Sequence, residues 1–96
     1  MTSDEVLHVL AAHRGALVER GVKSLRLFGS VARGEAVGDS DVDLLVEFSR
    51  PTGMFGLVRL KRYLEELLGC PVDLTTPGGL RESMRDRILK EAIDAA

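Results

Sequence analysis

The fold is decided by two stretches of sequence, Phe28-Gly-Ser-Val-Ala-Arg-Gly-Glu35 and Asp41-Val-Asp-Leu-Leu-Val-Glu-Phe48. Residues 24–28 alternate polar and apolar side chains and run directly into a Gly-Ser pair, which is typical of a short strand that ends in a turn. The second stretch has a period of two, so its side chains divide between the two faces of a strand. One face carries an apolar set and the other an acidic set: Val42, Leu44, Val46 and Phe48 against Asp41, Asp43 and Glu47.

The segment before these strands has the pattern of a helix. Apolar residues recur at helical spacing between residues 2 and 20, namely Val6, Leu7, Leu10, Leu17 and Val18. Thr2 and Glu5 have the spacing of a capping box, and Gly21 is placed to stop the helix. We therefore expect one helix over residues 2–20.

Further elements follow the second strand. After the breaker formed by residues 50–53, leucines at helical spacing predict a helix over residues 57–68, which Gly69 closes. Residues 72–75 predict a third short strand, and residues 77–79 predict a turn. Apolar residues at helical spacing between charged ones predict a final helix over residues 80–95, with a possible break near Arg85.

This order of elements predicts one α/β domain over residues 1–96, with a small sheet covered by helices. The chain is 45% hydrophobic and 29% charged, which excludes the compositions of disordered chains and of membrane proteins. Its start is acidic where a secretory signal would be basic, so we expect a cytoplasmic protein. A net charge of −2 disfavours general binding to a nucleic-acid backbone, which usually requires a basic face.

Three carboxylates carry the expected chemistry. Asp41 and Asp43 are two residues apart at the start of a strand, so both project from the same face, and like charges so placed favour a bound cation. Oxygen ligands select a hard ion such as Mg²⁺, which proteins hold with one or two carboxylates plus substrate phosphates. Asp73 is a third acid in an apolar run, and it joins the pair if its strand is a neighbour. Phosphoryl or nucleotidyl transfer is the chemistry that this arrangement predicts.

The turn after the first strand is a candidate phosphate site. Gly29 and Ser30 combine free backbone N–H groups, a hydroxyl and a missing Cβ, which together let phosphate oxygens approach closely. Arg33 follows on the same turn, and its guanidinium could equally neutralise phosphate charge or pair with a nearby acid. Both interpretations of Arg33 remain open from the sequence.

The combined spacing resembles a known family. Ten residues separate Gly29-Ser30 from Asp41-Val42-Asp43, which is the G-S-x10-D-x-D signature of polymerase beta type nucleotidyltransferases. The two quoted stretches, and the later Gly69-Cys-Pro-Val-Asp-Leu74, are similar in detail to the minimal single-domain branch called MNT. The resemblance implies the polymerase beta-like fold, with a small mixed sheet and helices packed on it.

The resemblance also implies roles for the site residues. Asp41 and Asp43 would hold the metal, with two Mg²⁺ ions expected, and Asp73 would complete the metal site and help to activate the nucleophile. Gly29 and Ser30, with Arg33 less firmly assigned, would bind the triphosphate of ATP. In the MNT branch the domain acts as the antitoxin of a helical HEPN toxin. We therefore expect AMP transfer from ATP to a hydroxyl of such a toxin, with tyrosine as the expected acceptor.

Two other functions fit the same residues. The chain could neutralise its partner by binding alone, with the acidic residues incidental to that role. It could also transfer a nucleotide to a small molecule such as an aminoglycoside, although relatives with that activity use additional substrate-binding domains. Template-dependent polymerisation is disfavoured, because no basic groove for a primer is evident in the sequence.

Overall fold

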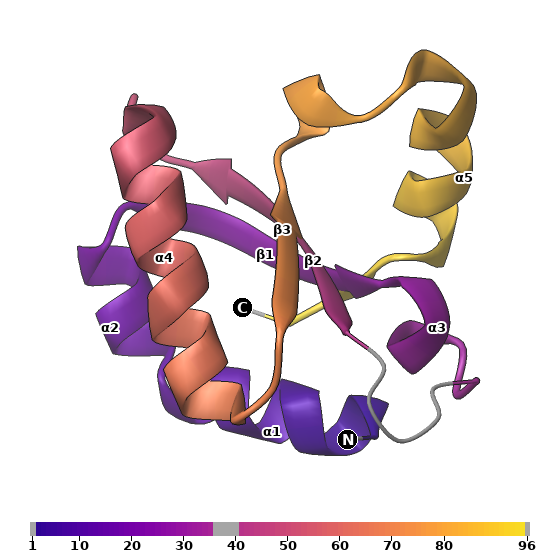
Figure 1. The fold of residues 1–96 in the computed structure, drawn as a ribbon, viewed down its shortest axis with the longest axis horizontal. Helices are drawn as coiled ribbons and strands as arrows, with labels where there is room; N and C mark the ends of the chain where they lie inside the picture. The colour runs from indigo at the N-terminus through magenta and orange to yellow at the C-terminus, as the bar shows by residue number, and fades with distance from the viewer. Residues whose placement is uncertain (1, 36–40, 96) are drawn as a thin grey trace.

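The computed structural model describes residues 2–35 and 41–95, and its elements alternate helices and strands (Figure 1). They are α1 (Ser3–Ala12), α2 (Arg14–Glu19), β1 (Val22–Phe28), α3 (Gly29–Ala32), β2 (Val42–Phe48), α4 (Gly53–Leu68), β3 (Val72–Thr75), the 3-10 turn η1 (Pro77–Gly79), α5 (Glu82–Glu91) and β4 (Ile93–Asp94). Residues 36–40, which belong to the ten residues between Gly29-Ser30 and Asp41-Val42-Asp43, lie outside the described residues.

The strands form one sheet in the order β3-β2-β1-β4. β1 pairs with β2 and with β4 in antiparallel fashion, whereas β2 pairs with β3 in parallel. A small mixed sheet with helices packed on it was predicted, and it is confirmed. At the start of the parallel pair, the Val42 N–H of β2 donates to the carbonyl of Pro71, the residue before β3, over 3.1 Å.

One face of the sheet is the core face. The side chains of Val42, Leu44 and Val46 are fully buried, which confirms the apolar face predicted for β2, and Phe48 packs against its edge. Helices α1, α2 and α4 cover this face and contribute Leu10, Leu17 and Leu64 among others (Figure 1). Burying each such leucine contributes about 1.5–3 kcal/mol, so the core fixes which face of β2 is left for the acidic residues.

The amino-terminal helix differs from the prediction. The capping box between Thr2 and Glu5 is present, but α1 ends at Ala12 and a separate helix, α2, begins at Arg14. The backbone of His13 leaves the helical region between them, with φ −110° and ψ 19°. As a result Val18, which we predicted on the apolar face, is 59% exposed.

The last segment also differs from the prediction of one helix over residues 80–95. Helix α5 starts at Glu82, passes Arg85 without a break and ends at Glu91, and the chain then forms β4. The edge of β1 explains the change, because its backbone groups need partners and β4 supplies them, including a 2.8 Å hydrogen bond from the Ala95 N–H to the Leu25 carbonyl. Pairing with this strand edge therefore takes Ile93 out of the helix that its spacing predicted.

Helix α4 is longer than predicted, because it begins at Gly53 inside the expected breaker. It ends as predicted at Gly69, which adopts the left-handed conformation with φ +69°. Three residues, 69–71, then lead into β3. Within residues 2–35 and 41–95, no helix has both the length and the hydropathy that crossing a bilayer requires.

Candidate active site

The structure places Asp43 and Asp73 side by side. Asp43 is the second residue of β2 and Asp73 the second residue of β3, and the parallel register pairs them directly. Neighbouring strands lie roughly 4.8 Å apart, and both side chains project from the sheet face opposite the core. The sequence predicted that Asp73 would join the other acids if its strand lay next to theirs, and β3 does lie next to β2.

Asp41 lies two residues before Asp43, just outside β2, and its side chain is exposed. Its carboxylate is near enough to Asp43 to act on that residue's ionisation. In the part of the chain that the structure describes, however, no three Asp, Glu, His or Cys side chains form a complete metal-binding group. The protein thus presents a carboxylate pair with a third acid beside it, and not a closed cage.

The environment of Asp43 disfavours its negative charge. Burial raises the pKa of this carboxyl above its ordinary value, and the carboxylate of Asp73 raises it further, followed by that of Asp41. The Arg33 guanidinium acts in the opposite direction and lowers the pKa of Asp43. Three acids with one nearby cation form a site where additional positive charge is favourable.

Gly29 makes room for the Asp43 carboxylate. It is the first residue of α3, where β1 ends, and its φ of +77° lies in the left-handed region. A Cβ placed on Gly29 would overlap the Oδ2 atom of Asp43. The backbone of the Gly-Ser turn therefore lies directly against the acid, an approach that no other residue permits.

Ser30 and Arg33 face the same hollow as the acids. A hollow of about 480 Å³ is lined by Gly29, Ser30, Arg33, Asp43 and Asp73. The first turn of α3 leaves backbone N–H groups without partners inside the helix, and Ser30 is half-buried there. Hydroxyl, amide and guanidinium donors thus lie beside the carboxylates. The donors suit a bound anion, and the carboxylates suit a bound cation.

Helix α5 also lines this hollow, a role that the sequence did not predict for the final helix. Its lining residues are Met84, Arg87, Ile88 and Glu91. Glu91 accepts hydrogen bonds from Arg33 Nη1 over 3.2 Å and from Arg87 Nε over 3.3 Å. Arg33 also donates from Nε to Glu35 over 3.0 Å. Arg87 and Glu91 are four residues apart, and this spacing by itself is typical of a surface ion pair within one helix.

The sequence of the chain matches a known family. A family model described as the nucleotidyltransferase domain matches residues 10–95. Over 94 residues the chain is 40% identical to the protein adenylyltransferase MntA of Thermococcus cleftensis, an alignment that covers 97% of this chain and 95% of that protein. Similarity of this extent spans both strands of the candidate site.

The structure also matches solved structures. One, described as a minimal nucleotidyltransferase, is 41% identical with a TM-score of 0.83, covering 97% of this chain and 95% of the other. A second is a complex of tri-AMPylated Shewanella oneidensis HEPN toxin with an MNT antitoxin, matched with a TM-score of 0.60. Its identity of 14%, over 91% of this chain and 71% of the matched chain, shows a shared fold.

Proposed function

Since this chain belongs to the nucleotidyltransferase domain family, we propose that it is a single-domain enzyme that transfers AMP from ATP to a hydroxyl of a partner protein. The partner is a HEPN-type toxin, the acceptor is a tyrosine, and the chain is the toxin's cytoplasmic antitoxin. The observation that carries this proposal is the direct pairing of Asp43 with Asp73 beside the Gly29-Ser30 turn. A 40% identical relative named as a protein adenylyltransferase, and an MNT antitoxin found with an AMPylated HEPN toxin, support it.

The reaction makes one bond and breaks one bond. The acceptor oxygen attacks the α-phosphorus of ATP, the bond from that phosphorus to the bridging oxygen of the β-phosphate breaks, and pyrophosphate leaves. The hydroxyl proton passes to the carboxylate of Asp73 and from there to solvent. Asp73 suits this role because its side chain is exposed, so that an incoming hydroxyl can reach it.

Asp41 and Asp43 would hold Mg²⁺ together with phosphate oxygens of ATP, and Asp73 would join them where a second ion binds. The donor set fits this ion, because all three side chains offer hard oxygen ligands and the carboxylates of Asp73 and Asp41 disfavour a further negative charge on Asp43. When bound, Mg²⁺ neutralises charge that develops on the phosphates. One or two protein carboxylates are enough to hold Mg²⁺ together with phosphate oxygens, so its binding does not require a complete group of protein ligands.

Gly29 and Ser30 would bind the triphosphate. The backbone of Gly29 lies against Asp43, so phosphate oxygens held by this turn are next to the carboxylates. The hydroxyl of Ser30 and the N–H groups of the first α3 turn are donors for those oxygens. Binding at this turn orients the α-phosphorus toward the acceptor.

The primary test uses the purified chain, a HEPN-type protein encoded in the same genome, Mg²⁺ and ATP labelled on the α-phosphate. We expect label on the partner, a mass increase of whole AMP units, and loss of labelling when EDTA is added. Peptide mass spectrometry locates the acceptor residue. Unlabelled partner, with Asp41→Ala and Asp43→Ala variants neutralising the toxin as well as wild type, would refute enzymatic action and leave neutralisation by binding alone.

Arg33 provides a separate prediction. Its guanidinium lines the hollow but also pairs with Glu35 and Glu91, so the structure contains both interactions that the sequence left open. If Arg33 binds phosphate, Arg33→Gln raises the KM for ATP by about 10-fold or more, the value of one charge-assisted hydrogen bond. Steady-state kinetics measure this change, with Glu35→Gln as the control that removes an ion pair and keeps the guanidinium. Equal KM values for both variants would show that Arg33 is structural.

A further inference from the structure

Large apolar side chains are exposed at the start of α4, and none of them lines the hollow that contains Asp43 and Asp73. Met54 is 79% exposed, Phe55 83% and Val58 41%. At 100° per residue they fall, with Arg59, within about 140° of the helix circumference, so they form one continuous surface. Contiguous exposed apolar side chains of this size mark interaction sites more often than free surface.

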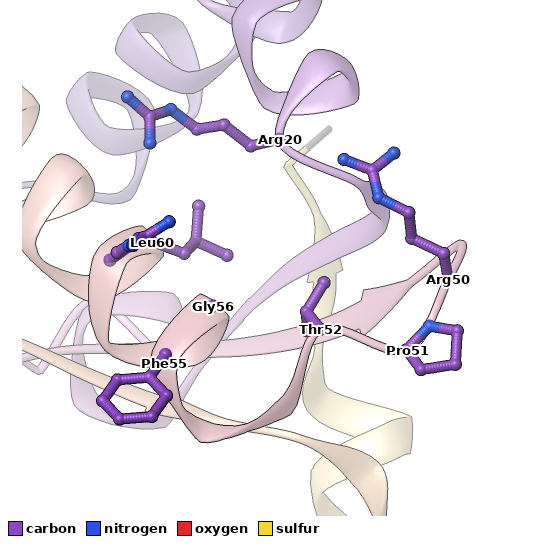
Figure 2. A pocket seen from close by; sticks show the side chains of 8 residues that line it. Arg20, Arg50, Pro51, Thr52, Phe55, Gly56 and Leu60 are labelled. Carbon is purple, nitrogen blue, oxygen red and sulfur yellow. The ribbon is translucent and has the colours of Figure 1, made fainter.

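A hollow lined by arginines adjoins these side chains. It measures about 440 Å³, and Figure 2 shows Arg20 and Arg50 along one side of it with Phe55 on another. The guanidinium of Arg20 stacks on the Tyr63 ring at 3.9 Å, and Arg50 donates to the Glu19 carbonyl over 3.3 Å. Both arginines are therefore held in position by contacts other than ion pairs with carboxylates.

Carboxylates do not neutralise this hollow. Arg20, Arg50 and Arg59 line it, and none of the three takes part in an ion pair among residues 2–35 and 41–95. A second hollow of about 370 Å³ shares Thr52 with the first and is lined mainly by apolar groups, including Phe48, Met54 and Leu57. The combination of an exposed aromatic, methionine and arginines is the composition that protein interfaces favour.

The exposed apolar side chains and the three arginines together form a surface that we call the α4 shoulder. It consists of Met54, Phe55, Val58, Arg20, Arg50 and Arg59. The shoulder adjoins the far end of β2, whereas Asp43 lies near its start (Figure 1). Phe48 lies five positions after Asp43 in the strand, which corresponds to about 17 Å at roughly 3.3 Å per residue. A protein bound to the shoulder would leave the hollow of the candidate active site open.

We propose that the α4 shoulder docks the partner protein, through a partner surface that combines carboxylates with apolar side chains. This inference rests on the proposed function, because it presupposes a protein substrate. Charge complementarity identifies the occupant, because three arginines that form no ion pair within the described part of the chain favour an acidic surface. A second copy of this chain would place like charges opposite one another across a two-fold axis, so it is disfavoured.

The experiment measures binding and AMP transfer separately, with the same HEPN-type protein as probe. Isothermal titration calorimetry compares the Kd of wild type for the partner with those of Phe55→Ser and Arg59→Glu. We expect each variant to raise the Kd by about 30-fold or more, which is the effect of one hot-spot residue. Asp43→Asn should bind as tightly as wild type. Val18→Ser and Lys23→Glu are matched controls, because both positions are exposed and neither lines a hollow described above.

The outcomes separate this inference from the proposed function. If wild type labels the partner and the shoulder variants bind with unchanged Kd, the shoulder is not the docking surface and the proposed function stands. If wild type neither binds nor labels the partner, both are overturned. Sedimentation velocity of the chain alone should show a monomer. A dimer that Phe55→Ser abolishes would instead assign the shoulder to a second copy.

Discussion

Replacing Asp43 by asparagine is expected to lower the rate of AMP transfer by about 10³-fold, equivalent to about 4 kcal/mol of transition-state stabilisation. The amide keeps the shape of the side chain but removes the charge that a cation at this site requires. Thermal stability should not fall, because the carboxylate is disfavoured by its burial and by the charges of Asp73 and Asp41. Single-turnover transfer of α-labelled AMP and a thermal melt measure the two quantities.

Glu47→Gln is the control for that variant. Glu47 lies on the same face of β2 as Asp43, is also partly buried and does not line the candidate active site. We expect its AMP transfer rate to remain within about twofold of wild type, since surface changes away from a site rarely alter its chemistry. Transfer by Asp43→Asn at a similar rate would remove Asp43 from the catalytic machinery.

The second large effect is expected for Gly29→Ala. An alanine Cβ would collide with the Asp43 carboxylate and would also sit at a φ of +77°, so the acid must move or the Gly-Ser turn must open. We expect a loss of about 100-fold or more in AMP transfer, because misplacing a reacting group by about 1 Å costs that much. Left-handed strain adds a stability loss of about 1–2 kcal/mol.

Gly34→Ala separates these two causes. Gly34 has nearly the same φ, +72°, but a Cβ there meets no atom of residues 2–35 and 41–95 within 4 Å. It should lose similar stability in a chemical denaturation experiment while retaining most of its transfer activity. If both alanine variants lose activity equally, the effect arises from backbone strain and the contact of Gly29 with Asp43 is unimportant.

Local patterns predicted the strands of the site because burial imposes a period of two. The apolar face of β2 follows from Val42, Leu44 and Val46 alone, and it leaves Asp43 on the opposite face. The sequence could not fix the partner of Asp43, because pairing and register depend on how distant strands pack. Only the structure shows that β3 is parallel to β2 and that Asp73 is in register with Asp43.

Contacts between distant segments explain what the sequence missed. Glu91 reaches Arg33 from 58 positions away, and its spacing in the chain carries no sign of that contact. Ile93 has the spacing of a helical residue, yet it pairs with Leu27 because the edge of β1 offers backbone groups that need partners. Val18 fits the helical repeat of the first segment, but the change of direction at His13 turns it to the surface.

The tight link between α4 and β3 limits how this protein can vary. Only residues 69–71 connect the two elements, and hydrogen bonds at Pro71 and Val72 hold the start of β3 in place. Losing or gaining one residue in this link would shift β3 by one position and turn Asp73 into the hydrophobic interior, with Val72 or Leu74 in its place. If the proposed function holds, AMP transfer therefore depends on the length of this loop as well as on Asp73.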